Sequence, residues 1–184
     1  MTHTEIVNKV KSILNEHGEV DAVSIGEDRV LLEDYIESAI PDAVVMLASK
    51  GYRVNAKRAL ADDWEDVDIQ DFVSLIRATT SGWKRDVTKI TEKNSPEYVM
   101  SQNEFTKPGV NSPMVVLVDN SPYGKPNGTT VFVEYNAKYD GQNLNAGEKE
   151  ATAVCYMAAA LVLGMFGDDL GKQRLSDVAT NMLQ

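Results

Sequence analysis

The densest group of side chains that could bind an ion or transfer a proton is the acidic segment 61–71. Six of its eleven residues are carboxylates: Asp62, Asp63, Glu65, Asp66, Asp68 and Asp71. Carboxylates suit a hard cation such as calcium, but a calcium-binding loop also needs a glycine at its sixth position and a glutamate at its twelfth. The segment meets neither requirement, so the sequence favours a solvated acidic loop without a bound metal.

Catalysis by general acid–base or nucleophilic groups would require ionisable side chains that the fold brings together. The two histidines, His3 and His17, are predicted at exposed positions in or beside the first helix, and the single cysteine, Cys155, lies in a distant apolar segment. This separation argues against a Ser-His-Asp or Cys-His arrangement. The glycines at 164 and 167 follow a predicted helix and not a strand, which is the wrong context for a phosphate loop. We therefore predict that the protein is not an enzyme and has no cofactor.

Molecular recognition is the second kind of chemistry that the side chains could perform. Trp83, Lys84 and Arg85 are consecutive, and tryptophan and arginine carry much of the binding energy of protein interfaces. Alternatively, Trp83 is a half-buried strand residue whose neighbouring cations face water, and the sequence leaves both interpretations open. The first predicts that Trp83→Ala weakens assembly of a folded monomer, and the second predicts that it unfolds the monomer.

Other cations form a second basic group before the acidic segment. Arg53, Lys57 and Arg58 could pair with the acidic loop of a neighbouring subunit or with acids of their own subunit. The sequence leaves these two alternatives open as well.

Helices are predicted in the amino-terminal part of the chain. The first begins after Thr2 or Thr4, has Ile6, Val10, Ile13 and Leu14 on one face, and ends at Gly18. The second spans about 27–50, with an apolar stripe of Leu32, Ile36, Ile40, Val44 and Leu47. Pro41 lies within this stripe and predicts a kink or break at 39–40, and Gly51 is placed to end the helix.

The middle of the chain has the pattern of β-structure. Strands are predicted at 72–79, 83–90, 114–118 and 130–135, with a short helix at 95–102 that Ser95 caps. The turn-rich segment 121–128 is predicted to be the hairpin loop between the last two strands.

Helices return at the carboxyl-terminal end. One is predicted from about 147 to 165, with Cys155 as a small buried apolar residue. The last runs from Asp168 or Leu170 to Leu183, and its apolar face comprises Leu175, Val178, Ala179 and Met182. The predicted fold is α+β: a helical body of 1–60 plus 147–184, with a β-rich insertion at 61–146, in a single compact unit.

The composition limits the classes of partner. The chain has 184 residues, 43% of them hydrophobic, and its 28 acids against 18 bases give a net charge of −10. This charge repels phosphate and argues against a tight nucleic-acid binder, although not against a protein that stands near DNA. The amino terminus lacks the layout of a secretory signal, and the longest apolar stretch, 151–166, is shorter than the roughly 20 residues of a membrane-spanning helix. We therefore expect a cytosolic protein without membrane contact.

Several segments resemble proteins of tailed phages that infect Bacteroidetes, the crAss-like phages among them. The similarity lies in Leu32-Glu-Asp-Tyr-Ile-Glu-Ser-Ala-Ile-Pro-Asp-Ala-Val44, Asp71-Phe-Val-Ser-Leu75, Trp83-Lys-Arg85, Ser95-Pro-Glu-Tyr98, Gln102-Asn103 and Pro113-Met-Val-Val-Leu117. The plan of helices flanking a β insertion also resembles the head-to-tail adaptor, or connector, proteins of short-tailed phages. The resemblance covers about residues 5–120, and the last helices only by their layout.

The resemblance implies a structural subunit of the virion at the head–tail junction, made in the cytoplasm of the bacterial host. Such adaptors form rings, usually twelve-fold, that dock under the portal protein, contact other tail or ring proteins and extend the DNA channel. By this resemblance, Leu175, Val178 and Met182 of the last helix, with Trp83, Lys84 and Arg85, would lie at subunit or portal interfaces. The acids Asp62, Asp63, Glu65, Asp66 and Asp68 would line a channel through which DNA passes without specific binding. The alternative is another tail-completion or head-bound assembly protein of similar fold.

Overall fold

The computed structural model describes residues 1–16, 32–118 and 121–184, and these form five helices and five strands. The predicted mixed α+β class is confirmed. The chain divides into two compact units, 1–55 with 138–184 and 56–137, where the sequence predicts one. The boundaries also differ from the predicted ones, because Ala56–Ala61 form a strand and because segment 138–146 bonds to the amino-terminal residues. Gln142, for example, accepts a hydrogen bond from the backbone of His3.

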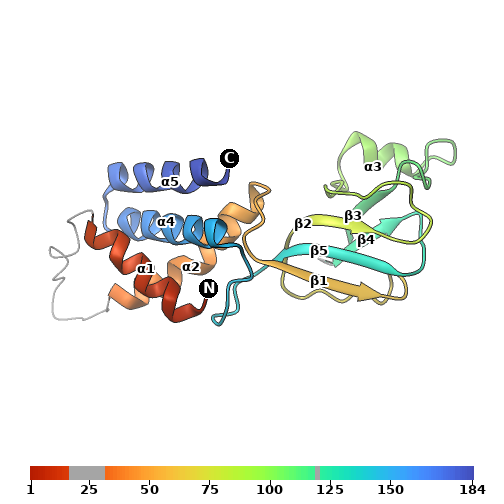
Figure 1. The fold of residues 1–184 in the computed structure, drawn as a ribbon. Helices are drawn as coiled ribbons and strands as arrows, with labels where there is room; N and C mark the ends of the chain where they lie inside the picture. Colours follow the sequence, from red (N-terminus) through yellow and green to blue (C-terminus); the bar gives the residue numbers. More distant parts are fainter. Residues whose placement is uncertain (17–31, 119–120) are drawn as a thin grey trace. The chain divides into compact units, whose positions relative to one another are not determined.

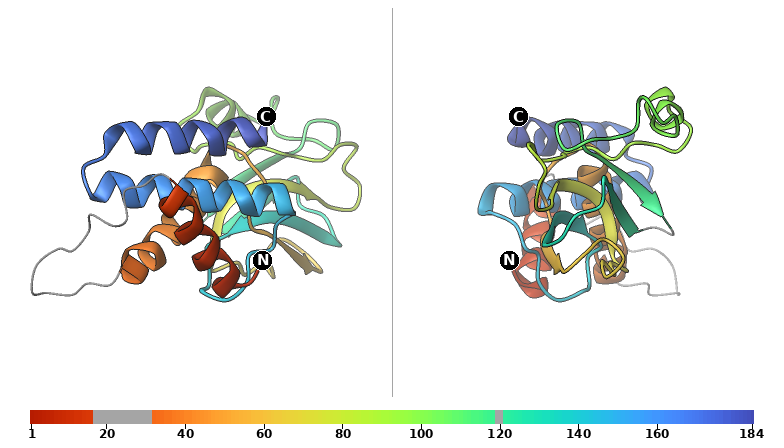
Figure 2. Two further views of the ribbon diagram at one scale, coloured as in Figure 1. Left: turned by 60° about the vertical axis from the view of Figure 1, so that its left-hand side comes forward. Right: turned by 90° about the vertical axis from the view of Figure 1, so that its right-hand side faces the viewer.

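The first unit consists of four helices: α1 (His3–Glu16), α2 (Leu32–Ser49), α4 (Glu148–Met165) and α5 (Asp169–Leu183). Helix α4 contacts the other three, and Figures 1 and 2 show it between α5 and the remaining two. Its buried residues are spread around its circumference, which is the pattern of a helix surrounded by other helices. Many of them, such as Ala153, Ala158 and Ala159, are small, so neighbouring backbones can approach closely. Cys155 is buried here, as predicted.

The ends of the first two described helices are held by local hydrogen bonds. Thr2 Oγ1 accepts from the Glu5 backbone N–H, and the Glu5 carboxylate accepts from the Thr2 N–H, which is a capping box. After α2, Gly51 has a φ of 89°, and the backbone N–H groups of Gly51 and Tyr52 donate to Ala48 and Leu47. This is the Schellman geometry that the predicted C-terminal glycine allows. Helix α2 continues through residues 39–41, so the break predicted at 39–40 as one alternative does not occur. Gly18 and residues 27–31 lie outside the described residues.

The second unit contains two small antiparallel sheets and a short helix. Strands β1 (Ala56–Ala61), β5 (Val131–Ala137) and β2 (Phe72–Thr79) form one sheet in that order, so β5 is its centre. Strands β3 (Met114–Val118) and β4 (Ser121–Lys125) pair as the other, and α3 (Pro96–Ser101) precedes them. Ser95 caps α3 as predicted, since its Oγ accepts from the Tyr98 N–H.

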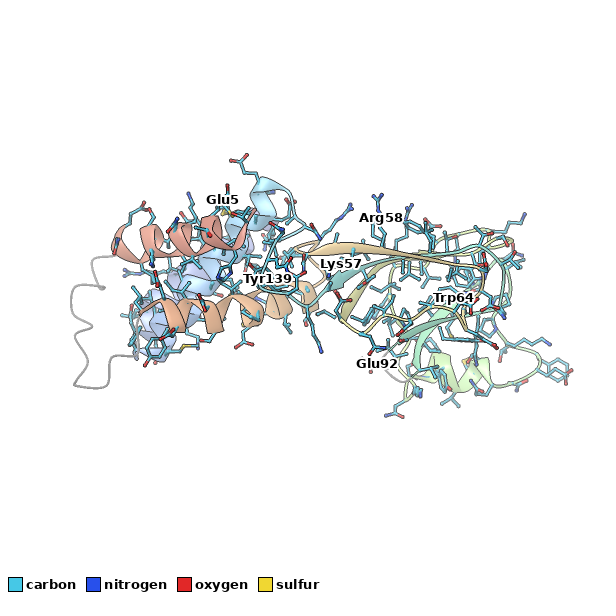
Figure 3. The ribbon with its side chains drawn as sticks, turned by 90° about the horizontal axis from the view of Figure 1, so that it is seen from below. Glu5, Lys57, Arg58, Trp64, Glu92 and Tyr139 are labelled. Carbon is cyan, nitrogen blue, oxygen red and sulfur yellow. The ribbon has the colours of Figure 1, made fainter. Side chains whose placement is uncertain are left out.

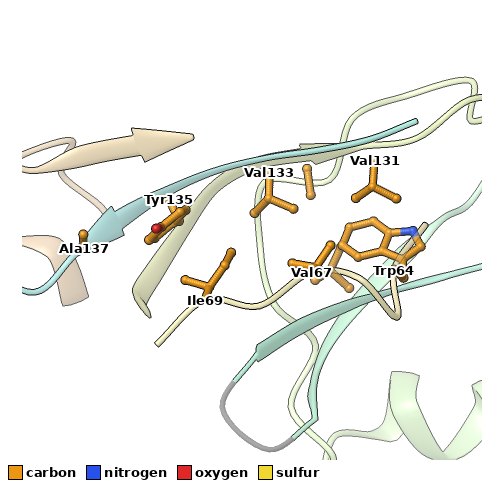
Figure 4. Close-up of a cluster of buried hydrophobic side chains, with 9 residues drawn as sticks. Trp64, Val67, Ile69, Val131, Val133, Tyr135 and Ala137 are labelled. Carbon is orange, nitrogen blue, oxygen red and sulfur yellow. The ribbon is translucent and has the colours of Figure 1, made fainter. Parts of the chain in front are cut away.

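The core of this unit is built around Trp64 (Figure 4). The core-facing residues of β5 alternate along the strand and cover one side of the cluster. The other members come mainly from the acidic segment, which the sequence predicts to be a loop without an apolar pattern. The buried residues of the cluster are Trp64, Val67, Ile69, Ala78, Val115, Val131, Val133, Tyr135 and Ala137.

Two predictions in the β region are wrong. Segment 83–90 is not a strand; it makes only isolated bridges, from Val87 to Ala78 and from Ile90 to Val115. Segment 121–128 is not simply a loop, because Ser121–Lys125 is strand β4 and pairs with β3. Pro122 and Gly124 are turn-forming residues, yet both are buried in this strand. A strand with only one neighbour tolerates a proline because its outer edge needs no donor.

Gly124 provides a direct test of the Trp64 packing. A Cβ atom at residue 124 would lie less than 3.0 Å from three atoms of the Trp64 side chain, namely two ring carbons and Nε1. We expect Gly124→Ala to destabilise the β unit by about 1–3 kcal/mol, because the ring or the strand must shift to admit the added methyl group. Urea unfolding followed by tryptophan fluorescence measures the effect.

The matched control is Gly109→Ala, where an added Cβ meets nothing within 4 Å. Equal stability of the two variants would contradict the packing of Trp64 against β4.

Candidate interaction surfaces

The acidic loop is anchored to the core of its unit and exposes its carboxylates. Asp63 Oδ1 accepts backbone hydrogen bonds from Glu65 at 2.7 Å and from Asp66 at 3.2 Å, which fixes a tight turn. Trp64, Val67 and Ile69 point inward between the acids. Of the predicted channel-lining residues, Asp63 is half-buried, and the exposed ones are Asp62, Glu65, Asp66 and Asp68. Within the described ranges, no group of three or more His, Cys, Asp or Glu side chains is placed to hold a metal ion.

The sixth acid of the segment, Asp71, makes contacts of a different kind. Lys57 Nζ lies 2.8 Å from Asp71 Oδ2, and the Tyr135 hydroxyl donates to Oδ1 at 3.0 Å. Burial opposes ionisation of Asp71, but the two hydrogen bonds and the charge of Lys57 outweigh it and lower the pKa of Asp71. Burial and the adjacent carboxylate raise the pKa of Tyr135 to about 12. The triad joins the end of the acidic loop to β1 and β5.

This triad predicts how the stability of the β unit depends on pH. Because the folded-state pKa of Asp71 is below its usual 3.8, its contribution is present above that pH and is lost as the pH falls through the lowered value. We expect the stability difference between wild type and Asp71→Asn to shrink as the pH falls below about 4. Urea unfolding at a series of pH values measures it.

Asp62→Asn, which alters an exposed acid of the same loop, is the control and should show no such change. A wild-type-to-Asp71→Asn difference that does not change on acidification would argue against the triad.

Trp83 packs against the core instead of standing free on the surface. Its ring stacks on that of Trp64, with centroids 5.7 Å apart, and its Nε1 donates to the Pro126 carbonyl at 3.0 Å. Trp83 is half-buried, which agrees with its interpretation as a half-buried residue whose neighbouring cations face water. It does not lie on a strand, although that interpretation assumes one. Lys84 and Arg85 are exposed, and Arg85 donates to Ser112 Oγ at 3.3 Å. Trp83 therefore packs on the core, whereas the two cations that follow it lie on the surface.

We now expect Trp83→Ala to act on folding. The variant loses ring stacking and one hydrogen bond, so the free energy of unfolding of the β unit should fall by about 2 kcal/mol. This is less than the roughly 3–5 kcal/mol lost when a fully buried tryptophan is replaced by alanine. Thermal unfolding followed by near-ultraviolet circular dichroism measures the loss. A double variant, Lys84→Ala with Arg85→Ala, is the control and should unfold within about 0.5 kcal/mol of wild type. A fully stable Trp83→Ala chain would restore the interface interpretation of this residue.

Two cations of the basic group before the acidic loop, Lys57 and Arg58, pair with acids of the β unit. Lys57 and Arg58 lie on opposite faces of β1 (Figure 3), and Lys57 contacts Asp71 as described. Arg58 Nε lies 3.1 Å from the buried carboxylate of Glu134 on β5. On the same face, Arg77 of β2 stands opposite Glu134, contacts Asp86 and lies over the Phe132 ring. For Lys57 and Arg58 the structure therefore shows local pairing.

Helix α5 divides its predicted apolar face between core and surface. Leu175 and Ala179 are buried, Met182 is half-buried and Val178 is exposed. Leu175 therefore stabilises the helical unit, and only Val178 and Met182 have surface available for a partner. The histidine at residue 3 is also part of this unit, where its Nδ1 lies 3.1 Å from the Tyr139 hydroxyl; His17 lies outside the described residues.

The largest exposed apolar side chains of the β unit are not among the residues predicted from the sequence. Val99 and Met100 on α3, and Phe105 in the turn that follows, are exposed, and Phe105 is 94% exposed. Leu60, at the end of β1, is 76% exposed. For Val99, Met100 and Phe105, the sequence signal is that apolar residues are few in the largely polar segment 95–107. Leu60 lies on strand β1 and carries no such signal.

Comparison with models of known protein families and with curated protein sequences finds no match. Among the helices of the described segments, none is long and apolar enough to cross a membrane.

Proposed function

We propose that the protein is a structural virion subunit that forms a ring between the portal protein and the tail of a phage and extends the DNA channel. The observation that carries the proposal is the surface of the β unit. It presents apolar side chains, Phe105 above all, on a segment held by hydrogen bonds, which is the form of a docking element. The arrangement of a helical unit with an inserted β unit accords with the adaptor plan.

The acidic loop supports the channel part of the proposal. Its exposed carboxylates are carried by a segment whose apolar residues are buried, so the negative charges are held in place. A wall of this kind repels phosphate and lets DNA pass without binding it. Helix α5, with Val178 and Met182 at its surface, is the proposed contact with the portal.

Mass photometry of the purified chain, with and without the portal protein of the same phage, tests the proposal. We expect a ring near twelve copies, alone or on the portal. A persistent monomer that ignores the portal would contradict the adaptor role, and capsid or tail proteins would then be tested as partners of a head-bound or tail-completion factor.

A matched pair of variants tests the portal contact of α5. Val178 on α5 and Val45 on α2 are both 39% exposed, so aspartate at either residue has a similar cost for folding. We expect Val178→Asp to weaken portal binding about tenfold, as loss of one important interface side chain does, and Val45→Asp to leave it unchanged. Equal binding by both variants would exclude this part of α5 from the interface.

A further inference from the structure

The connection between β4 and β5 contains the only asparagine–glycine pair of the sequence, Asn127-Gly128. Asn127 is exposed, and the backbone N–H of Gly128 donates to Asn127 Oδ1 at 2.9 Å. This hydrogen bond closes a small ring that holds the Gly128 nitrogen beside the Asn127 Cγ atom and polarises the side-chain carbonyl group. Two reacting groups that are already held together need little further ordering to form a bond.

Packing of this loop requires a glycine at residue 128. A Cβ atom there would lie 2.8 Å from the Ser81 carbonyl oxygen and 2.8 Å from Thr80 Oγ1. Because glycine has no Cβ atom, its backbone nitrogen is also less hindered than that of other residues. The property that lets the loop pack therefore leaves the Asn127 side chain next to an unshielded backbone nitrogen.

We propose that Asn127 is a site of spontaneous deamidation, and that the isoaspartate it forms loosens the contact between this loop and Trp83. Hydroxide takes the proton of the Gly128 amide, and the nitrogen attacks Cγ of Asn127. A bond forms between these two atoms, the bond from Cγ to the side-chain nitrogen breaks, and water protonates the leaving group, so that ammonia departs and hydroxide is regenerated. The inference does not rest on the proposed ring, since the reaction needs only one chain and water.

Water then opens the succinimide ring in one of two directions. Opening at Cγ gives aspartate with a normal backbone. Opening at the main-chain carbonyl carbon of residue 127 gives isoaspartate, in which the main chain runs through Cγ. Either product replaces a neutral amide by a carboxylate and adds one negative charge to the net charge of −10.

The isoaspartate product disturbs the hydrogen bonds that attach the loop to the segment after β2. The Pro126 carbonyl accepts from Trp83 Nε1 at 3.0 Å, and the Thr129 carbonyl accepts from the Ser81 N–H at 2.9 Å. These two acceptors lie on either side of the reacting pair, so an extra backbone carbon changes their spacing. Trp83 stacks on Trp64 and therefore carries the change to the core. Aspartate keeps the normal backbone and leaves both acceptors in place.

Two other exposed asparagines lack this geometry and serve as internal controls. Asn94 and Asn111 are each followed by serine. In each case the serine amide donates to the carbonyl oxygen three residues before it, at 3.0 Å after Asn94 and at 2.9 Å after Asn111. Neither nitrogen is therefore directed at the asparagine side chain that precedes it.

Mass spectrometry of peptides from the aged full-length chain measures the rate at each asparagine. We expect Asn127 to deamidate at least about tenfold faster than Asn94 or Asn111, which corresponds to a barrier lower by about 1.4 kcal/mol. The rate at Asn127 should rise with pH, because hydroxide removes the amide proton. Enzymatic methylation by an isoaspartyl methyltransferase distinguishes isoaspartate from aspartate. Equal rates at the three asparagines, or a product without isoaspartate, would overturn the proposal.

Two variants test the effect on the β unit. Asn127→Gln places the amide one carbon farther from the backbone nitrogen, so the chain should age without modification at residue 127 and without a change in tryptophan fluorescence. Asn127→Asp carries the product charge on a normal backbone and should unfold at the same urea concentration as fresh wild type. The acidic fraction of aged wild type, separated by ion exchange and shown to contain isoaspartate, should unfold at a lower urea concentration than both. If this fraction unfolds as Asn127→Asp does, the effect on Trp83 is overturned.

Discussion

The β unit depends on the space that one glycine leaves for one tryptophan. Trp64 lies over Gly124 of β4, stacks on Trp83 and contacts the core-facing residues of β5, so a single indole joins both sheets and two loops. Its Nε1 finds no hydrogen-bond acceptor among the described residues, which costs about 1–3 kcal/mol. The apolar burial that the ring provides must exceed that cost. Without Trp64, the acidic loop would lose its anchor.

The two units solve the packing problem in different ways. In the helical unit, a helix apolar on all sides lies at the centre, and alanines let its neighbours approach. The β unit has short strands and long connections, so side-chain hydrogen bonds hold the parts that the sheets do not. Asp63 fixes the turn of the acidic loop, and Asn103 fixes the turn that carries Phe105. These hydrogen bonds thus fix the backbone of both turns.

The sequence predicted elements where one physical signal dominated. The β-branched run 72–79 and the apolar segment 147–165 became β2 and α4 with nearly the predicted bounds. Predictions from the sequence were wrong where the residue type indicated one role and tertiary packing gave the residue another. The carboxylates around Trp64 indicated a solvated loop, yet Trp64 is a core residue. Gly124 indicated a turn, yet it lies in a strand and its lack of a side chain makes room for Trp64. The stacking of Trp83 on Trp64 depends on a contact between segments that are separated in the chain, which no local pattern reports.

The inserted unit begins and ends on neighbouring strands, since Ala56 of β1 pairs with Asn136 of β5. In the helical unit, Asn55 donates to the Lys138 carbonyl and accepts from the Asn145 N–H, which ties together the points where the chain leaves and returns. Adjacent ends of this kind let a segment be exchanged without disturbing its host. Segment 56–137 therefore has the adjacent ends of an exchangeable insertion: a short linker could replace it, and a different β module could be grafted at the same two residues.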